Sequence, residues 1–141
     1  MINFFHTMVR VSDLEKSLKF FCGTLGLREV RRWISEKGRF TIVHVGAPND
    51  PETLTIELTH NWDPEALTSG RNFGHIAFVV DDIYETCDRI MKDGVTINRP
   101  PRDGNLAFIQ TPDGISIEIR QRGEAKPPTE PWKSMSNVGT W

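Results

Sequence analysis

Cysteine is scarce in this sequence, with two copies among 141 residues. Cys22 and Cys87 belong to no CxxC pair and to no other metal-ligand spacing. This excludes a zinc ribbon and a scaffold held together by several disulfides. We therefore predict reduced thiols in the core of a protein from a reducing compartment.

Long apolar runs and a surplus of charge are also missing. No stretch approaches the roughly 20 apolar residues of a membrane-spanning helix, and the N-terminus lacks the basic and then apolar pattern of a secretion signal. The net charge is −2, from 17 basic and 19 acidic residues. Since no basic field favours nucleic acid or a membrane surface, we expect a cytoplasmic protein without either partner.

What the sequence does contain is a pattern written twice. A histidine, a valine, an aspartate, an aliphatic residue and a hydroxyl residue recur 69 positions later (75 − 6) at the same spacing. A chain of 141 residues suits one domain, and a repeat of about half that length indicates two small modules that share a core. The two copies are His6, Val11, Asp13, Leu14 and Ser17, and His75, Val80, Asp82, Ile83 and Thr86.

Periodicity predicts a strand, a helix and three further strands in each half. Ser12 and Glu15 form a predicted capping box for the first helix, and Asp82 with Glu85 opens the second. Each half therefore reads as βαβββ, which predicts an α+β fold of paired modules with a curved mixed sheet. Besides the first strand of the second half, which carries His75, the expected strands are 3–11, 27–34, 40–46, 53–59, 95–98, 105–110 and 115–121. The expected apolar helix stripes are Leu14, Leu18, Phe21 and Leu25, and Ile83, Cys87, Ile90 and Met91, ended by Gly26 and Gly94.

The domain prediction follows from this pattern. A single domain over 1–122 contains modules at about 3–59 and 72–121. The Pro-rich residues 123–141 lose periodicity and are expected to form a tail. Trp132 and Trp141 either pin this tail onto a groove or fray with it, and the sequence leaves both alternatives open.

Alternation within the strands predicts where polar side chains point. Glu57 opposes the aliphatic residues of its strand, and Glu118 opposes three isoleucines. His6 and His75 stand at equivalent positions of the two first strands. We therefore expect His6, Glu57, His75 and Glu118 on a concave polar face of the sheet.

Two imidazoles and two carboxylates make a plausible set of metal ligands. Imidazole nitrogen and carboxylate oxygen suit Zn(II), Ni(II), Co(II) or Fe(II). A single histidine or glutamate on a strand is more often structural, so the prediction rests on the joint placement of His6, Glu57, His75 and Glu118. His44 and His60 have no counterpart in the other half, and we interpret them as structural or surface residues.

Over roughly residues 3–121 the chain resembles glyoxalase I (lactoylglutathione lyase), a family of the vicinal oxygen chelate superfamily. This resemblance implies the glyoxalase/bleomycin-resistance-like fold and a homodimer with its sites at the subunit interface. The motifs that carry it are His6-Thr-Met-Val-Arg10, Ile56-Glu57-Leu-Thr-His-Asn61-Trp62, Gly74-His75-Ile-Ala-Phe78, and Leu106 to Gly114 followed by Ile117-Glu118.

The resemblance also implies an activity. The enzyme would convert the hemithioacetal of methylglyoxal and glutathione into S-D-lactoylglutathione through a cis-enediolate, as a step of methylglyoxal detoxification. Its metal ligands would be His6, Glu57, His75 and Glu118. The short chain resembles the class activated by Ni(II) or Co(II) more than the Zn(II) class. Because a carboxylate must move the proton, Glu118 is the expected base, and Glu57 is the alternative.

By the same resemblance, Arg10, Asn61 and Arg71 would bind glutathione, since arginine forks hold carboxylates. Arg102 falls near a position where some family members carry lysine, and it is the fourth candidate for substrate binding. The tail has no counterpart in the family that we can place. One alternative is another metalloenzyme of the superfamily that acts on a different thiol adduct or 2-oxoaldehyde. A second is a metal-free, small-molecule-binding dimer, which the intact ligand set argues against.

Overall fold

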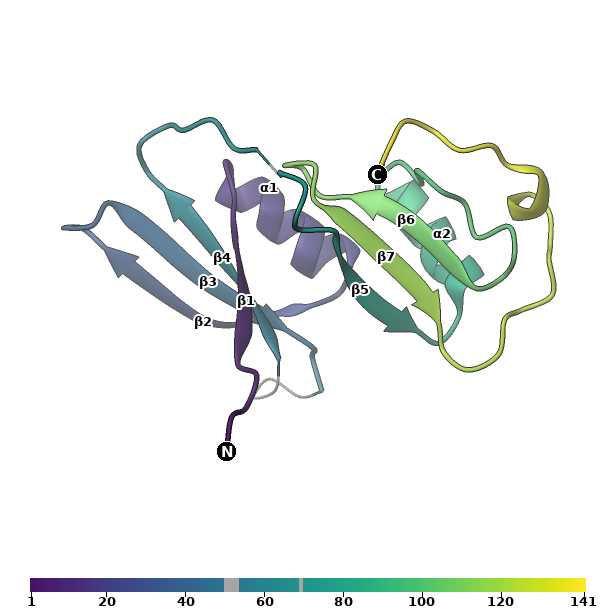
Figure 1. Ribbon diagram of the computed structural model, residues 1–141, viewed down its shortest axis with the longest axis horizontal. Coiled ribbons are helices and arrows are strands. Elements are labelled where there is room, and N and C mark those ends of the chain that lie inside the picture. The colour runs from purple at the N-terminus through teal and green to yellow at the C-terminus, as the bar shows by residue number, and fades with distance from the viewer. Residues whose placement is uncertain (50–53, 69) are drawn as a thin grey trace. The chain divides into compact units, whose positions relative to one another are not determined.

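The structure, a computed structural model, describes residues 1–49, 54–68 and 70–141. It divides into two compact units, Met1–Thr68 and Ser69–Trp141, which correspond to the halves of the sequence repeat. Figure 1 shows that each unit combines helix and sheet, as the α+β prediction required. Thr53, predicted as the start of a strand, lies outside the described residues. Within them, no helix has both the length and the apolar character needed to cross a bilayer.

The N-terminal unit carries a four-stranded mixed sheet in the order β1-β4-β3-β2. β1 (His6–Arg10) runs parallel to β4 (Thr55–Asn61), while β3 (Phe40–Gly46) runs antiparallel to both β4 and β2 (Arg28–Ser35). α1 (Leu14–Leu18) continues into the π-helical segment η1 (Lys19–Thr24). The core that helix and sheet share includes Val9, Phe20, Phe21, Val43, Val45 and Leu58.

The C-terminal unit carries a three-stranded sheet in the order β5-β7-β6. β5 (His75–Val80) runs parallel to β7 (Ser116–Gln121), which pairs antiparallel with β6 (Leu106–Gln110). α2 (Ile83–Lys92) packs on the sheet (Figure 1) and buries three of the four predicted stripe residues, whereas Met91 is 44% exposed. The shared core includes Ile83, Cys87, Ile90, Ile109, Ile117 and Ile119.

Both cysteines are free, as predicted. Burial, and then the nearby charge of Asp88, raise the pKa of the Cys87 thiol to about 12. Burial and Glu29 also raise the pKa of the half-buried Cys22. Because the thiolate is the reactive form, Cys87 behaves as a small core residue rather than as a nucleophile.

The predicted strand at 95–98 is wrong. Phe108 of β6 exchanges backbone hydrogen bonds with Arg99 across an isolated bridge, and no named strand covers 95–98. The tail binds this segment instead, because the Val138 N–H donates to the Asn98 carbonyl at 2.8 Å and the Asn98 amide donates to the Val138 carbonyl at 3.0 Å. Ile97 is buried, so the apolar pattern of this segment reflects burial of its side chains and not a strand.

Helix α1 begins at Asp13 rather than at Ser12, which corrects the predicted capping box. Asp13 Oδ1 accepts a hydrogen bond from the Lys16 backbone N–H at 3.0 Å. Its counterpart Asp82 accepts from two backbone N–H groups in the first turn of α2, as predicted. Both aspartates have φ −137° and ψ 108°, so the two modules start their helices in the same conformation.

The tail, residues 123–141, packs onto the C-terminal unit (yellow in Figure 1) and contains the short helix η2 (Trp132–Ser134). Trp132 is 2% exposed, and Lys126 forms an ion pair with Asp82. A Cβ on Gly104 would lie 1.9 Å from the Lys126 carbonyl oxygen, so the close approach of the two backbones requires glycine. Of the two alternatives left open by the sequence, the pinned tail is therefore the one observed.

Candidate metal centre

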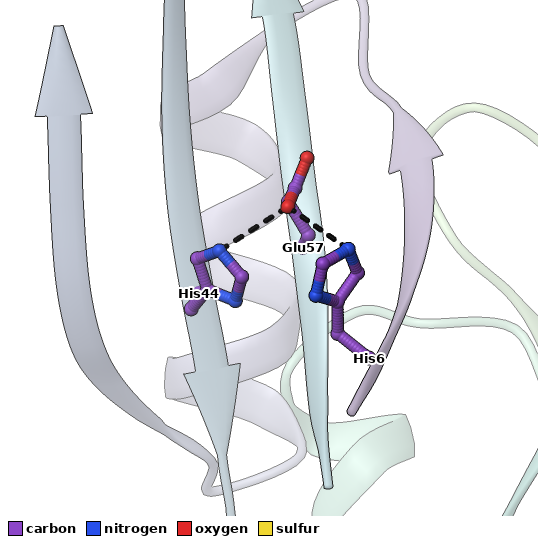
Figure 2. A group of neighbouring side chains, drawn as sticks. All are labelled: His6, His44 and Glu57. Atoms are coloured by element: carbon purple, nitrogen blue, oxygen red, sulfur yellow. Dashed lines mark ion pairs between the residues drawn. The ribbon is translucent and has the colours of Figure 1, made fainter. Parts of the chain in front are cut away.

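Strand pairing in the N-terminal unit gathers three polar side chains on one face. β3 and β1 flank β4. His44 of β3 and Met8 of β1 are the residues directly opposite Glu57 of β4. His6 precedes Met8 by two residues, so it shares the face of Glu57, as alternation predicted. Figure 2 shows both imidazole rings directed at the Glu57 carboxylate.

The two imidazoles contact the same carboxylate oxygen. Nε2 of His6 and Nε2 of His44 each lie 3.2 Å from Oε2 of Glu57. The other oxygen, Oε1, accepts a hydrogen bond from the Thr59 hydroxyl at 3.2 Å. Nδ1 of His44 lies 3.0 Å from the Thr55 hydroxyl. Neighbours on β3 and β4 thus fix both the carboxylate and the His44 ring.

His44 is buried, so of the structural and surface positions predicted for it, the surface position is excluded. Burial lowers the pKa of His44, and the charge of Arg31 lowers it further, while Glu57 acts in the opposite direction. A neutral imidazole keeps a nitrogen lone pair, which is the form that binds metals.

This set of donor atoms fits a divalent cation. One ligand atom from each of His6, His44 and Glu57 lies within 4.8 Å of the others. Two imidazole nitrogens and a carboxylate oxygen are the donors that first-row transition metals prefer. Nδ1 of His6 is buried and has no hydrogen-bond partner among the described residues, so that nitrogen does not tie the ring to a structural role. The cluster is a candidate metal centre.

A second His–Glu pair lies in the C-terminal unit. Nε2 of His75 lies 3.1 Å from Oε2 of Glu118, and the Arg120 guanidinium donates to Oε1 of Glu118 at 3.2 Å. The Glu118 side chain is 11% exposed and that of His75 is 42% exposed. The four ligands predicted from the sequence therefore occur as two pairs, one within each unit.

The residues predicted to bind substrate lie in different surroundings. Arg10 is exposed on β1, and Asn61 donates to the Glu65 carboxylate at 2.6 Å at the end of β4. Arg71 is exposed and lines a cavity in the C-terminal unit. Arg102 donates through Nη1 to two oxygens of the tail, at 3.0 and 2.7 Å, so its guanidinium holds the tail in this structure.

The cavity in the C-terminal unit has a volume of about 440 Å³. Arg71 and Gln110 give it polar groups, and Trp141 gives it an apolar wall. Gly74, the residue before His75, also lines it. The cavity thus borders the start of the strand that carries one of the predicted ligands.

His44 is the member of the cluster that sequence reasoning missed. It stands between Val43 and Val45, which are both fully buried, so alternation puts it on the polar face of β3. That signal was present in the sequence. The prediction from the repeat requires a counterpart in the other half, which His44 lacks, and therefore leaves His44 out of the ligand set.

Comparison with known proteins agrees with this geometry. Residues 3–119 match the Glyoxalase/Bleomycin resistance protein/Dioxygenase superfamily. The lactoylglutathione lyase of Neisseria meningitidis serogroup A is 43% identical over 122 residues, which cover 83% of this chain and 88% of that protein. The chain belongs to the glyoxalase I family. The lactoylglutathione lyase of Haemophilus influenzae, another glyoxalase I relative, is 36% identical over 126 residues, covering 86% of this chain and 93% of that protein.

Solved glyoxalase I structures share the fold. The Leishmania major enzyme, described as trypanothione-dependent, superposes with a TM-score of 0.80 at 32% identity, over 86% of this chain and 87% of that chain. A glyoxalase I from Zea mays gives a TM-score of 0.77 at 30% identity, over 85% of this chain and 44% of that chain. These matches confirm the predicted fold of two βαβββ-like modules. The superfamily match ends at residue 119, so the tail lies beyond it.

Proposed function

We propose that the protein is a lactoylglutathione lyase that converts the hemithioacetal of methylglyoxal and glutathione into S-D-lactoylglutathione, and so detoxifies methylglyoxal. The observation that carries this proposal is the His6–His44–Glu57 cluster on the polar face of a glyoxalase I fold. The His75–Glu118 pair on the second module supports it. Relatives named for this activity match more than four fifths of the chain.

We assign the proton transfer to Glu118. The reaction moves a proton from the carbon that bears sulfur to the neighbouring carbon through a cis-enediolate, with no net oxidation and no co-reactant. A single carboxylate can accept the proton and return it one atom away. Glu118 is buried between the His75 and Arg120 contacts, which hold both of its oxygens. Glu57, whose Oε2 contacts two imidazoles and whose Oε1 accepts from the Thr59 hydroxyl, is the alternative base.

We propose His6, Glu57, His75 and Glu118 as the ligands of one divalent metal, with His44 orienting Glu57 beside them. The cation, Ni(II) or Co(II) in preference to Zn(II), would supply positive charge that stabilises the two substrate oxygens as negative charge develops. The imidazole and carboxylate donors of both units support this assignment.

The thiol part of the substrate would bind through charged and amide side chains. Glutathione has two carboxylates, and arginine binds carboxylates through two parallel hydrogen bonds. We propose that Arg10, Asn61 and Arg71 contact glutathione directly. Arg102 would act indirectly, because its guanidinium contacts the tail.

A complete site needs both His–Glu pairs, and we propose that a homodimer assembles it at the subunit interface. In such a dimer, His6 and Glu57 of one chain meet His75 and Glu118 of the other. The free cysteines fit a cytoplasmic location, since a reducing compartment keeps thiols unpaired.

The test is a metal-reconstitution assay. Protein stripped of metal by a chelator is reloaded with Ni(II), Co(II) or Zn(II), and thioester formation from methylglyoxal and glutathione is followed by ultraviolet absorbance. We expect no turnover without metal and recovery with Ni(II) or Co(II) above that with Zn(II). If the protein binds all three metals stoichiometrically but turns over with none of them, the lyase assignment is rejected.

For the thiol part of the substrate, one specific alternative to glutathione can be tested. The Leishmania major relative is described as trypanothione-dependent, so the same assay should include trypanothione. A higher kcat/KM with trypanothione than with glutathione would retain the isomerisation chemistry and replace the thiol.

A further inference from the structure

The tail brings an aromatic side chain to the polar face of the C-terminal sheet. Trp141 stacks on Phe108 of β6, with ring centroids 6.0 Å apart and an interplanar angle of 23°. Phe108 in turn makes an edge contact with His75, with centroids 5.4 Å apart. The rings of Trp141, Phe108 and His75 therefore form a continuous row that ends at a predicted metal ligand.

Strand register places this row next to the carboxylate assigned to proton transfer. Phe108 lies directly opposite Glu118 in the β6–β7 pairing. His75 lies opposite Ser116 in the β5–β7 pairing, two residues before Glu118. Because directly opposed residues project on the same side of a sheet, these side chains share one face. Trp141 covers that face at β6.

The position of Trp141 is set by a series of contacts along the tail. Lys126 pairs with Asp82, and Trp132 is buried in the unit. Arg102 donates to the Met135 carbonyl, and the Asn98 backbone and side chain both bond Val138. The Trp141 indole therefore arrives at Phe108 from a fixed backbone. Trp141 is nevertheless 40% exposed, so part of its surface is available to a ligand.

We propose that Trp141 is a specificity-determining residue, whose indole, with Phe108, forms an aromatic wall for the substituent that the 2-oxoaldehyde contributes to the substrate. The wall favours aryl and long apolar substituents over methyl. This inference rests on the proposed lyase function.

The reaction determines which part of the substrate contacts the aromatic wall of Trp141 and Phe108. The aldehyde-derived substituent is attached to the carbon that receives the proton from Glu118, so it must lie close to Phe108, the residue opposite Glu118. The thiol part carries carboxylates and suits Arg71, which lines the same cavity as Trp141. An aromatic face offers an aryl substituent both apolar burial and ring stacking, and it offers a methyl group little of either.

The test compares two substrates and two binding probes on the metal-loaded protein. In Trp141→Ala, we expect the ratio of kcat/KM for the phenylglyoxal adduct over the methylglyoxal adduct to fall about tenfold, the size expected for one aromatic contact. Calorimetry should show that the preference for S-benzylglutathione over S-methylglutathione falls by a similar factor. Trp141→Phe, which keeps a ring, should retain most of both preferences.

Met91→Ala is the matched control, because it removes an exposed apolar side chain from α2 and should leave both ratios unchanged. Turnover with ratios that do not respond to Trp141→Ala would overturn the aromatic wall and leave the lyase function standing. Absence of turnover, with a benzyl preference that depends on Trp141, would retain the wall and reject the lyase function. Equal losses for both substrates and both probes would overturn the wall, since they report a general defect.

Discussion

Glu118 and His75 allow metal binding and proton transfer to be separated at the scale of single residues. Glu118→Gln keeps the size of the side chain and an oxygen, but it removes the group that accepts the proton. We expect kcat to fall about a thousandfold. Calorimetry should show a smaller loss of Ni(II) affinity than in His75→Ala, which removes the nitrogen of a proposed ligand outright. Near-wild-type turnover of Glu118→Gln would exclude Glu118 as the base and point to Glu57.

His44 provides the second test at this scale, because it contacts Glu57 and is absent from the ligand set that the resemblance implies. His44→Phe keeps an aromatic ring but removes the nitrogen that lies 3.2 Å from Oε2 of Glu57. Loss of such an orienting contact costs about 10- to 100-fold in metal affinity, and we expect a fall in this range by calorimetric titration with Ni(II).

The control for His44 is His60→Phe, which changes another histidine of the N-terminal unit. His60 bonds the Val11 carbonyl at 3.1 Å and takes no part in the cluster, so metal affinity should be unchanged. Equal affinities for the His44 and His60 variants would show that His44 contributes only to packing.

Single residues also show what the sequence could and could not predict about the site. The faces of His6, Glu57, His75 and Glu118 followed from a period of two, which each strand carries in its own sequence. The contact between His44 and Glu57 depends on how β3 and β4 align, and alignment between strands is set by the turn and by long-range pairing. Alternation alone puts His44 on a face, but it does not give its partner.

At the scale of elements, the link between the tail and helix α2 predicts a pH-dependent stability. The Lys126 ammonium, and then backbone N–H groups at the start of α2, hold the pKa of Asp82 below its ordinary value of 3.8. A carboxylate with a lowered folded-state pKa stabilises the fold fully above its unfolded pKa and loses that contribution as the pH falls through the folded value. The effect of Asp82 should therefore be complete at neutral pH and fade below about pH 4.

Two substitutions at Asp82 separate the ion pair from the helix cap. Asparagine keeps a capping oxygen but has no charge, so Asp82→Asn should lower the free energy of unfolding by less than about 1 kcal/mol near neutral pH. Asp82→Ala loses both interactions and should cost about 1–2 kcal/mol. Urea unfolding near pH 7 and near pH 3 measures both. A difference between wild type and Asp82→Asn that stays constant with pH would contradict the assigned ion pair.

The elements predicted correctly are those whose signals are local. Polar caps and glycine ends located both helices to within a residue or so, since caps act within one turn; the cap of α2 is Asp82 as predicted, whereas that of α1 is Asp13 and not Ser12. The strand predicted at 95–98 was wrong because the hydrogen-bond partner of Asn98 is Val138, which lies far along the chain in the tail. A short apolar run has the same pattern whether it joins a sheet or packs under a loop, so its partner decides the structure.

At the scale of the whole molecule, the proposed dimer makes a quantitative prediction. The variants His6→Ala and His75→Ala should each be inactive, because each removes one ligand from every site. When the two proteins are unfolded together in equal amounts and refolded, half of the dimers should be mixed. A mixed dimer with shared sites contains one site that lacks both histidines and one that retains both. The mixture should therefore recover about a quarter of wild-type activity.

The same mixture distinguishes a metal site shared between two chains from a metal site built within one chain. If His6 and His75 of one chain bound the same metal, every site in the mixed dimer would still lack a histidine, and activity would stay at the level of the separate variants. Refolding each variant by itself controls for recovery from denaturation, and size-exclusion chromatography confirms that dimers have formed. Recovery near a quarter would assign each metal to two chains, because only exchange of half-sites between subunits regenerates an intact set of ligands.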